Sequence, residues 1–139
     1  MRKRTPAKRR SGCPISFTLD TFGDKWALLI IRDLMFKGKR NYGEFLQSEE
    51  GIATNILSDR LKRLEEVGIV LKEVDPDNRR KFVYRLADKG VDLLPLLLEM
   101  ILWGSKHDPK TEAPKEFIRR LERDREGVLR ELRKRLRRS

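Results

Sequence analysis

The chain has 139 residues, enough for one domain with short extensions. It carries 33 Lys and Arg against 22 Asp and Glu, a formal net charge of +11, which predicts an anionic partner: nucleic acid first, an acidic membrane surface second. One cysteine and one histidine exclude an intrachain disulfide and a zinc site of the usual Cys and His type, so we expect no metal ion and no cofactor.

The positive charge is concentrated at the two ends of the chain. Residues 1–10 carry six basic and no acidic side chains, and residues 115–139 carry eleven basic and five acidic ones. We therefore expect a basic flexible arm over 1–12, a globular domain over 13–106, and a linker with a basic helical tail over 107–139. No apolar stretch reaches the roughly 20 residues that span a bilayer, and no signal peptide is visible, so we expect a cytoplasmic, nucleoid-associated protein.

Three helices are expected in the first part of the domain. A short helix spans residues 16–21 with Ser16 as its N-cap, and Asp24 caps the second. Asn41 is the N-cap of the third, and Glu44 is its capping-box partner. The second helix carries apolar residues every three or four positions, at Trp26, Leu29, Ile30 and Leu34.

Residues 51–68 form the most informative stretch, an amphipathic helix that Gly68 ends. Its apolar stripe consists of Ile56, Leu57, Leu61 and Leu64. Its other side carries Thr54, Asn55, Ser58, Asp59 and Lys62. Small hydrogen-bonding side chains mixed with positive charge suit base edges and phosphates in a groove. The helix start is weak because Ala53, at the natural N-cap position, has no side-chain acceptor, so Thr54 is an alternative cap.

A β-hairpin follows this helix. Two runs rich in β-branched and aromatic residues, 69–74 and 81–86, flank a turn-forming segment at 75–80. The tip of the hairpin is expected to carry the basic residues Arg79, Arg80 and Lys81.

Helical patterns continue to the end of the chain. Asp88 is expected to cap a long apolar helix that runs to about Gly104, in which Pro95 either causes a kink or marks the true start. The tail from Lys115 has apolar residues at helical spacing among many arginines, at Phe117, Leu121, Val128, Leu132 and Leu136. Three interpretations stay open: a helix that crosses to a partner subunit, added non-specific DNA affinity, or a loosely ordered solvated helix.

A helical unit with a polar outer face on its last helix, followed by a basic hairpin, is typical of a winged helix-turn-helix. Over about residues 13–103 the sequence resembles the HxlR family of bacterial and archaeal transcriptional regulators. The motifs that carry this resemblance are Cys-Pro at 13–14, Gly23-Asp-Lys-Trp-Ala-Leu-Leu-Ile-Ile-Arg-Asp-Leu34, Tyr42-Gly-Glu-Phe-Leu46, Gly51-Ile52, Leu57-Ser-x-Arg-Leu-x-x-Leu-Glu-x-x-Gly68, and Tyr84-Arg-Leu-Ala-Asp-Lys-Gly90. Ala53 and Ala87 depart from the Ser and Thr that are usual in the family.

The resemblance implies a mainly α (α+β) fold, a winged helix-turn-helix with extra N- and C-terminal helices that form a dimer interface. It also implies a homodimer whose two recognition helices read a palindromic operator. We expect an effector, if there is one, to be a small molecule or a redox signal.

The predicted DNA-binding residues lie on the recognition helix and the hairpin. Base contacts are expected from Thr54, Asn55 and Ser58, and phosphate contacts from Lys62 and Arg63. The expected contacts of the hairpin with the minor groove or its phosphates come from Arg79, Arg80 and Lys81. The alternatives are an ordinary solvated helix face and a charged turn that protects a sheet edge. Arg60 points nearer the core and is expected to make an ion pair.

Cys13 has two interpretations. It follows Arg9 and Arg10 and precedes a helix start, which favours the reactive thiolate, and some members of the resembled family sense oxidants or electrophiles at the matching position. The other interpretation, which we weigh above the first, is a small apolar residue in a dimer contact. With one cysteine in the chain, a switch would need alkylation, a small-thiol adduct, or pairing with the dimer copy.

The sequence therefore predicts a sequence-specific regulator that binds double-stranded DNA. A repressor is expected, because a dimer that covers a promoter blocks polymerase. The alternatives are an architectural, chromatin-like protein with little sequence preference, and a basic module that binds RNA or an acidic membrane. An enzyme is not expected, because no nucleophile–base pair and no glycine-rich phosphate loop is visible, and Asp24, Asp33 and Glu44 fit caps and ion pairs.

Overall fold

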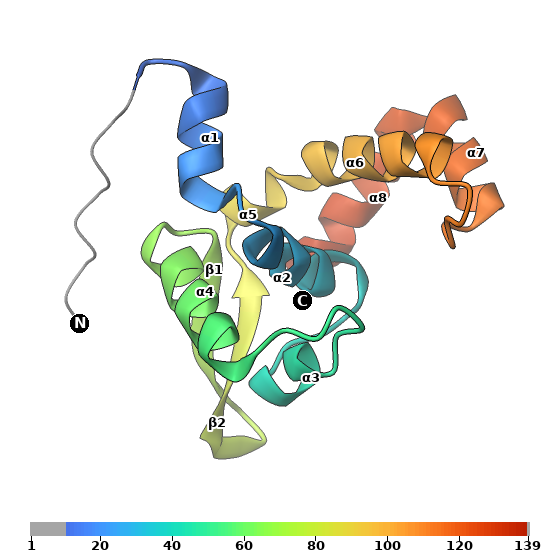
Figure 1. Cartoon of the computed structure of the whole chain (residues 1–139). Coiled ribbons are helices and arrows are strands. Elements are labelled where there is room, and N and C mark those ends of the chain that lie inside the picture. Colours follow the sequence, from blue (N-terminus) through green and yellow to red (C-terminus); the bar gives the residue numbers. More distant parts are fainter. Residues whose placement is uncertain (1–10, 139) are drawn as a thin grey trace. The chain divides into compact units, whose positions relative to one another are not determined.

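The computed structural model describes residues 11–138, which form two compact units divided after Gly90. The first unit holds α1 (Pro14–Phe22), α2 (Lys25–Phe36), α3 (Tyr42–Leu46), α4 (Thr54–Glu66), β1 (Val70–Asp75) and β2 (Asn78–Leu86) (Figure 1). The short helix α5 (Asp88–Val91) spans the junction. The second unit holds α6 (Leu94–His107), α7 (Lys115–Arg123) and α8 (Arg125–Arg138). The predicted basic arm, residues 1–12, lies mostly outside the described residues.

Among the first three helices, the starts of α2 and α3 follow the predicted capping residues and the start of α1 does not. Asp24 Oδ1 accepts from the backbone nitrogens of Trp26 and Ala27 at 2.9 and 3.0 Å, which confirms it as the cap of α2. Asn41 and Glu44 make the predicted capping box of α3. Ser16 is wrong as the cap of α1, because the helix begins earlier, at Pro14. A proline suits the first turn, where its missing N–H needs no partner.

The core of the first unit lies beneath α4. Three of its four predicted stripe residues, Leu57, Leu61 and Leu64, are at most 2% exposed, and Ile56 is half-buried. They share the core with buried residues of neighbouring elements: Ile30, Ile31, Phe45, Ile69, Val70 and Tyr84. Gly68, with a φ of 82°, follows α4 as predicted, since a left-handed conformation there suits glycine.

The hairpin is antiparallel, and Val70 pairs with Leu86 at its base while Asp75 pairs with Asn78 at its tip. The turn is therefore shorter than predicted, and Arg79 and Arg80 join Lys81 on β2, near the tip of the hairpin. The register shifts between Val74 and Asp75, so these three basic residues form a bulge without partners on β1. The base of the hairpin is buried and its outer half is exposed. Tyr84 N donates to the carbonyl of Arg40 at 2.7 Å, which joins the segment before α3 to the hairpin.

The second unit is entirely helical over its described residues. A continuous helix from Asp88 is wrong, because α5 ends at Val91. The alternative that the long helix starts near Pro95 is confirmed, since α6 begins at Leu94 with Pro95 in its first turn. Helices α6 and α7 each contact α8, which explains why the compact unit begins upstream of the predicted boundary at residue 106. No helix between residues 11 and 138 combines the length and apolar character needed to cross a membrane.

Candidate nucleic-acid interface

The outer face of α4 is exposed from Thr54 to Lys62. Leu57, Leu61 and Leu64 hold the helix against the core. The other side presents Thr54, Asn55, Ser58, Asp59 and Lys62 to solvent. The structure therefore brings four of the predicted DNA-contacting residues onto one surface, at Thr54, Asn55, Ser58 and Lys62.

Tyr42, at the start of α3, fixes the first two turns of α4. Its hydroxyl donates to the carbonyl of Thr54 at 2.8 Å and lies 2.9 Å from Ser58 Oγ. A phenol has one proton, so Ser58 is the donor in the second contact. Tyr42 was not among the predicted site residues, because a hydroxyl that pairs across 12 and 16 positions leaves no trace in local spacing.

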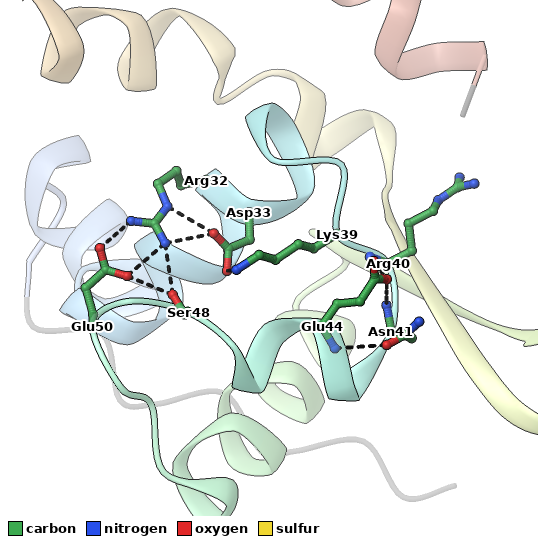
Figure 2. A network of polar contacts seen from close by, with 8 residues as sticks. All are labelled: Arg32, Asp33, Lys39, Arg40, Asn41, Glu44, Ser48 and Glu50. Carbon is green, nitrogen blue, oxygen red and sulfur yellow. Dashed lines mark hydrogen bonds and ion pairs between the residues drawn. The ribbon is translucent and has the colours of Figure 1, made fainter. Parts of the chain in front are cut away.

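A polar network ties the loop before α4 to α2 (Figure 2). Arg32 donates to both carboxylate oxygens of Glu50, at 2.6 and 2.9 Å, and to Ser48 Oγ at 3.1 Å. Its guanidinium also bonds Asp33, which is only 2% exposed and has a second cation, Lys39 Nζ, at 3.4 Å. Asp33 thus belongs to an ion-pair network, as expected, but a buried one.

Formation of the Arg32–Glu50 pair shifts the pKa values of both partners. Hydrogen bonds from Arg32 and Ser48 lower the pKa of Glu50 from 4.5 to about 2. The hydrogen bond to Glu50 in turn raises the pKa of the Arg32 guanidinium. Glu50 therefore stays ionised through the neutral range and holds the loop whose Gly51, with a φ of 73°, turns the chain toward α4.

The start of α4 has no side-chain cap. Ala53 occupies the N-cap position, and its methyl side chain cannot accept a hydrogen bond. Thr54 is the first helical residue and does not serve as the alternative cap. The contacts of Tyr42, Glu50 and Gly51 surround this start.

Two arginines join α4 to preceding helices. Arg60 Nε lies 3.0 Å from Asp24 Oδ2, which confirms the predicted ion pair. Arg63 Nη2 donates to the carbonyl of Asp20 in α1 at 2.9 Å, so this predicted phosphate contact already has a partner within the unit. Asp24 therefore serves both the start of α2 and the position of α4.

The hairpin continues the exposed surface of α4. Arg79, Arg80 and Lys81 are exposed on β2. A hollow of about 260 Å³ lies between α3, α4 and the hairpin, and it brings Lys62 of α4 and Lys72 of β1 to one wall. Burial raises the pKa of Tyr84 at this wall, with Glu65 and Tyr42 adding to the shift. Helix and hairpin thus contribute Lys62 and Lys72 to the lining of one hollow.

Cys13 is exposed and occupies the N-cap position of α1, and its backbone nitrogen donates to Ser11 Oγ at 3.2 Å. Arg9 and Arg10, invoked for its reactivity, lie outside the described residues. Within residues 11–138, no three side chains of the His, Cys, Asp and Glu types gather as a metal-binding group would require.

Comparisons with known proteins agree with this geometry. The model of the HxlR-like helix-turn-helix matches residues 21–112. The HTH-type transcriptional regulator sll1512 of Synechocystis is 37% identical over 93 residues, which cover 67% of this chain and 68% of that protein. The crystal structure of PA1607 has a TM-score of 0.67 and 37% identity, covering 76% of this chain and 73% of that one. The redox regulator HypR in its oxidized form has a TM-score of 0.60 and 36% identity, covering 68% and 96% of the two chains.

Proposed function

Since the chain belongs to the HxlR-like helix-turn-helix family and is a transcriptional regulator with the winged-helix fold, as predicted, we propose that it binds a palindromic operator as a homodimer and represses transcription. The observation that carries this proposal is the exposed outer face of α4 beside the basic hairpin, in one compact unit. α4 enters the major groove, and the hairpin contacts the flanking minor groove or its phosphates.

The residues divide by chemistry. Thr54, Asn55 and Ser58 are short, hydrogen-bonding and exposed, which supports base contacts. Lys62 reaches phosphates from the same face, and Arg63 contributes less because it also bonds Asp20. The hairpin contributes phosphate or minor-groove contacts through Arg79, Arg80 and Lys81.

Exposed apolar side chains support the homodimer. On α1, Ile15, Phe17 and Leu19 are 72%, 55% and 60% exposed. On α6, Leu96, Met100 and Trp103 are 39%, 45% and 70% exposed. Several exposed apolar side chains on each of two helices mark an interface, and a two-fold dimer places two α4 helices on two half-sites. A dimer bound over a promoter excludes polymerase, and in this role the protein acts in the cytoplasm, on the nucleoid.

The dimer is tested by the mass of the protein in solution. Phe17→Glu and Trp103→Glu are expected to yield monomers in light scattering, because each places a charge among the exposed apolar side chains of its helix. Phe82→Glu, at an exposed aromatic of the hairpin, is the matched control and keeps the dimer. Dimers of unchanged mass in both test variants would contradict the proposed interface.

Sequence recognition is tested by selecting a preferred site from random duplex DNA and comparing it with a shuffled duplex. Asn55→Ala is expected to reduce the discrimination between the two by about 1–3 kcal/mol, the scale of one good base contact. Gln47→Ala, which removes another exposed carboxamide, leaves discrimination unchanged. A wild-type protein without a preferred site would favour the architectural alternative.

A redox or electrophile effector is a second candidate, favoured by the exposure of Cys13 and by the similarity to HypR. Oxidation or alkylation of Cys13 would then weaken operator binding in the wild type and not in Cys13→Ser. If treated wild type and Cys13→Ser bind alike, Cys13 is a dimer contact or an inert surface residue.

A further inference from the structure

Helices α7 and α8 lie outside residues 21–112, the region matched by the family model, and they form an amphipathic pair. Their buried residues are Leu121, Val128, Leu129 and Leu132, at 1–7% exposure. Asp124 separates the helices, and its Oδ1 accepts from Gly127 N at 3.1 Å, an N-cap for α8. The tail is therefore a folded helical pair and not a loosely ordered helix, which removes one of the three interpretations.

The opposite side of α8 carries an arginine-rich stripe. Positions i, i+3, i+4, i+7 and i+8 from residue 130 share one side of a helix. They hold Arg130, Arg133, Lys134, Arg137 and Arg138, which we call the α8 stripe. All of its members are exposed except Arg133, which is half-buried. Eight residues at about 1.5 Å each give the stripe a length of about 12 Å.

No side chain within residues 11–138 neutralises the α8 stripe. Three nearby carboxylates are used elsewhere: Glu99 pairs with Arg125, Glu131 pairs with Arg120, and Asp124 caps α8. A fourth, Glu126, lies four positions before Arg130 and makes no ion pair with the stripe. None of the five stripe side chains has a hydrogen bond or ion pair to another described residue. Five cations on one side of a helix repel each other, so the stripe favours a polyanionic partner.

We propose that the α8 stripe is a second, sequence-independent contact with the phosphate backbone of duplex DNA. This inference rests on the proposed DNA-binding function, since an operator bound by α4 brings duplex DNA to the stripe at high effective concentration. Arginine and lysine side chains neutralise phosphates without reading bases, so the stripe adds affinity for any sequence.

The burial of the apolar side of α8 argues against a membrane as the partner. A helix that lies on a bilayer inserts its apolar face among the lipids. In α8 that face is already covered, since Val128, Leu129 and Leu132 are 1%, 4% and 7% exposed. Only the charged side is available, and a rigid line of charge suits the regular phosphates of a duplex.

The test compares two variants of the full chain with equal net charge. The stripe variant carries Arg130→Gln, Lys134→Gln, Arg137→Gln and Arg138→Gln. The matched control carries Lys106→Gln, Lys110→Gln, Lys115→Gln and Arg123→Gln, at four exposed positions of the same unit outside the stripe. Affinity for the selected operator and for a shuffled duplex is measured by fluorescence anisotropy over a series of salt concentrations.

The stripe variant is expected to lose affinity for both duplexes by the same factor, on the order of tenfold, and the slope of log affinity against log salt is expected to fall by about 2–4. The control variant keeps the wild-type slope. Thermal melting of both variants stays unchanged, because the replaced stripe residues are exposed and have no partners among the described residues. Equal losses in the two variants, or no loss in either, would overturn the proposal.

Two further titrations identify the partner. If the stripe variant loses more affinity for single-stranded RNA, or for vesicles of phosphatidylserine and phosphatidylcholine, than for duplex DNA, the assignment to duplex DNA is wrong. Failure of this inference is distinguishable from failure of the proposed function: a stripe variant with wild-type binding rejects the stripe alone, while a wild type without duplex preference rejects both.

Discussion

Helices α4 and α8 are both amphipathic, but they differ in the side-chain contacts that fix their positions. Each buries a stripe of leucines and exposes its other side. Side chains of two other segments, Tyr42 and Asp24, bond α4 directly, and the Arg32–Glu50 pair holds the loop that precedes it. α8 relies on its leucines, its cap and a few surface ion pairs. The difference matches the proposed tasks, because reading base edges needs fixed positions while attraction to phosphates does not.

The strongest way to break this comparison is to open the core beneath α4. Leu57→Ala at a fully buried position is expected to lower the free energy of unfolding by about 2–5 kcal/mol, since the cavity cannot close completely. Urea denaturation measures the change. Leu136→Ala, at a half-buried position of α8, gives a smaller loss. Equal losses would mean that α4 is no more firmly held than α8.

The next largest effect concerns the network that holds the loop before α4. Arg32→Gln removes the ion pair with Glu50 and one of the two cations beside buried Asp33, so we expect a loss of about 1–3 kcal/mol in the free energy of unfolding. Arg40→Gln, an exposed arginine outside these contacts, is the control. An Arg32 variant as stable as the control would show that the network does not help to hold the loop before α4.

The Arg32–Glu50 pair also predicts a dependence of stability on pH. The pKa of Glu50 is depressed from 4.5 to about 2, so its contribution is complete above pH 4.5 and is lost as the pH falls through 2. Between pH 4.5 and 2, the free energy of unfolding of Glu50→Gln, measured by urea denaturation, is expected to fall less steeply than that of the wild type. Glu49→Gln, at an exposed neighbour, keeps the wild-type decline. Identical profiles for all three proteins would show that this pair does not couple to folding.

The smallest expected effect is a gain in stability at the start of α4. Ala53→Ser supplies the missing side-chain acceptor and should raise the free energy of unfolding by about 0.5–1 kcal/mol in thermal melts. Ala53→Val, which adds no acceptor and is as poor an N-cap residue as alanine, is the comparison. A serine variant no more stable than the wild type would show that the surrounding contacts already compensate for the absent cap.

The parts of the fold that depend on short spacing were predictable from the sequence. The caps at Asp24 and Asn41, the stripe of α4 and its glycine stop all follow from residues within one or two turns of each other. The contacts that position α4 were not predictable, apart from the ion pair of Arg60. Arg32 and Glu50 lie 18 positions apart, and only the folded chain brings them together.

Local competition explains the remaining errors. Asn78 pairs with Asp75, which extends β2 toward the turn and places Arg79 and Arg80 on the strand beside Lys81, in a bulge. Asp88 begins a four-residue helix instead of capping a long one, because Pro95 requires a new helix start nearby. Asp124 interrupts the tail at a place where the apolar spacing alone suggested one helix. The eight proposed DNA contacts stay predictions that the binding measurements test.

The placement of the basic residues on β2 has a consequence for insertions and deletions. The pairing of the two strands shifts register between Val74 and Asp75, so Arg79, Arg80 and Lys81 have no pairing partner on β1 and form a bulge. Below the bulge Val74 pairs with Phe82, and the buried base at Tyr84 and Leu86 fixes the register of this stretch. One residue inserted among the three basic residues would therefore only enlarge the bulge, whereas one inserted between Phe82 and Tyr84 would exchange the two sides of the paired strand.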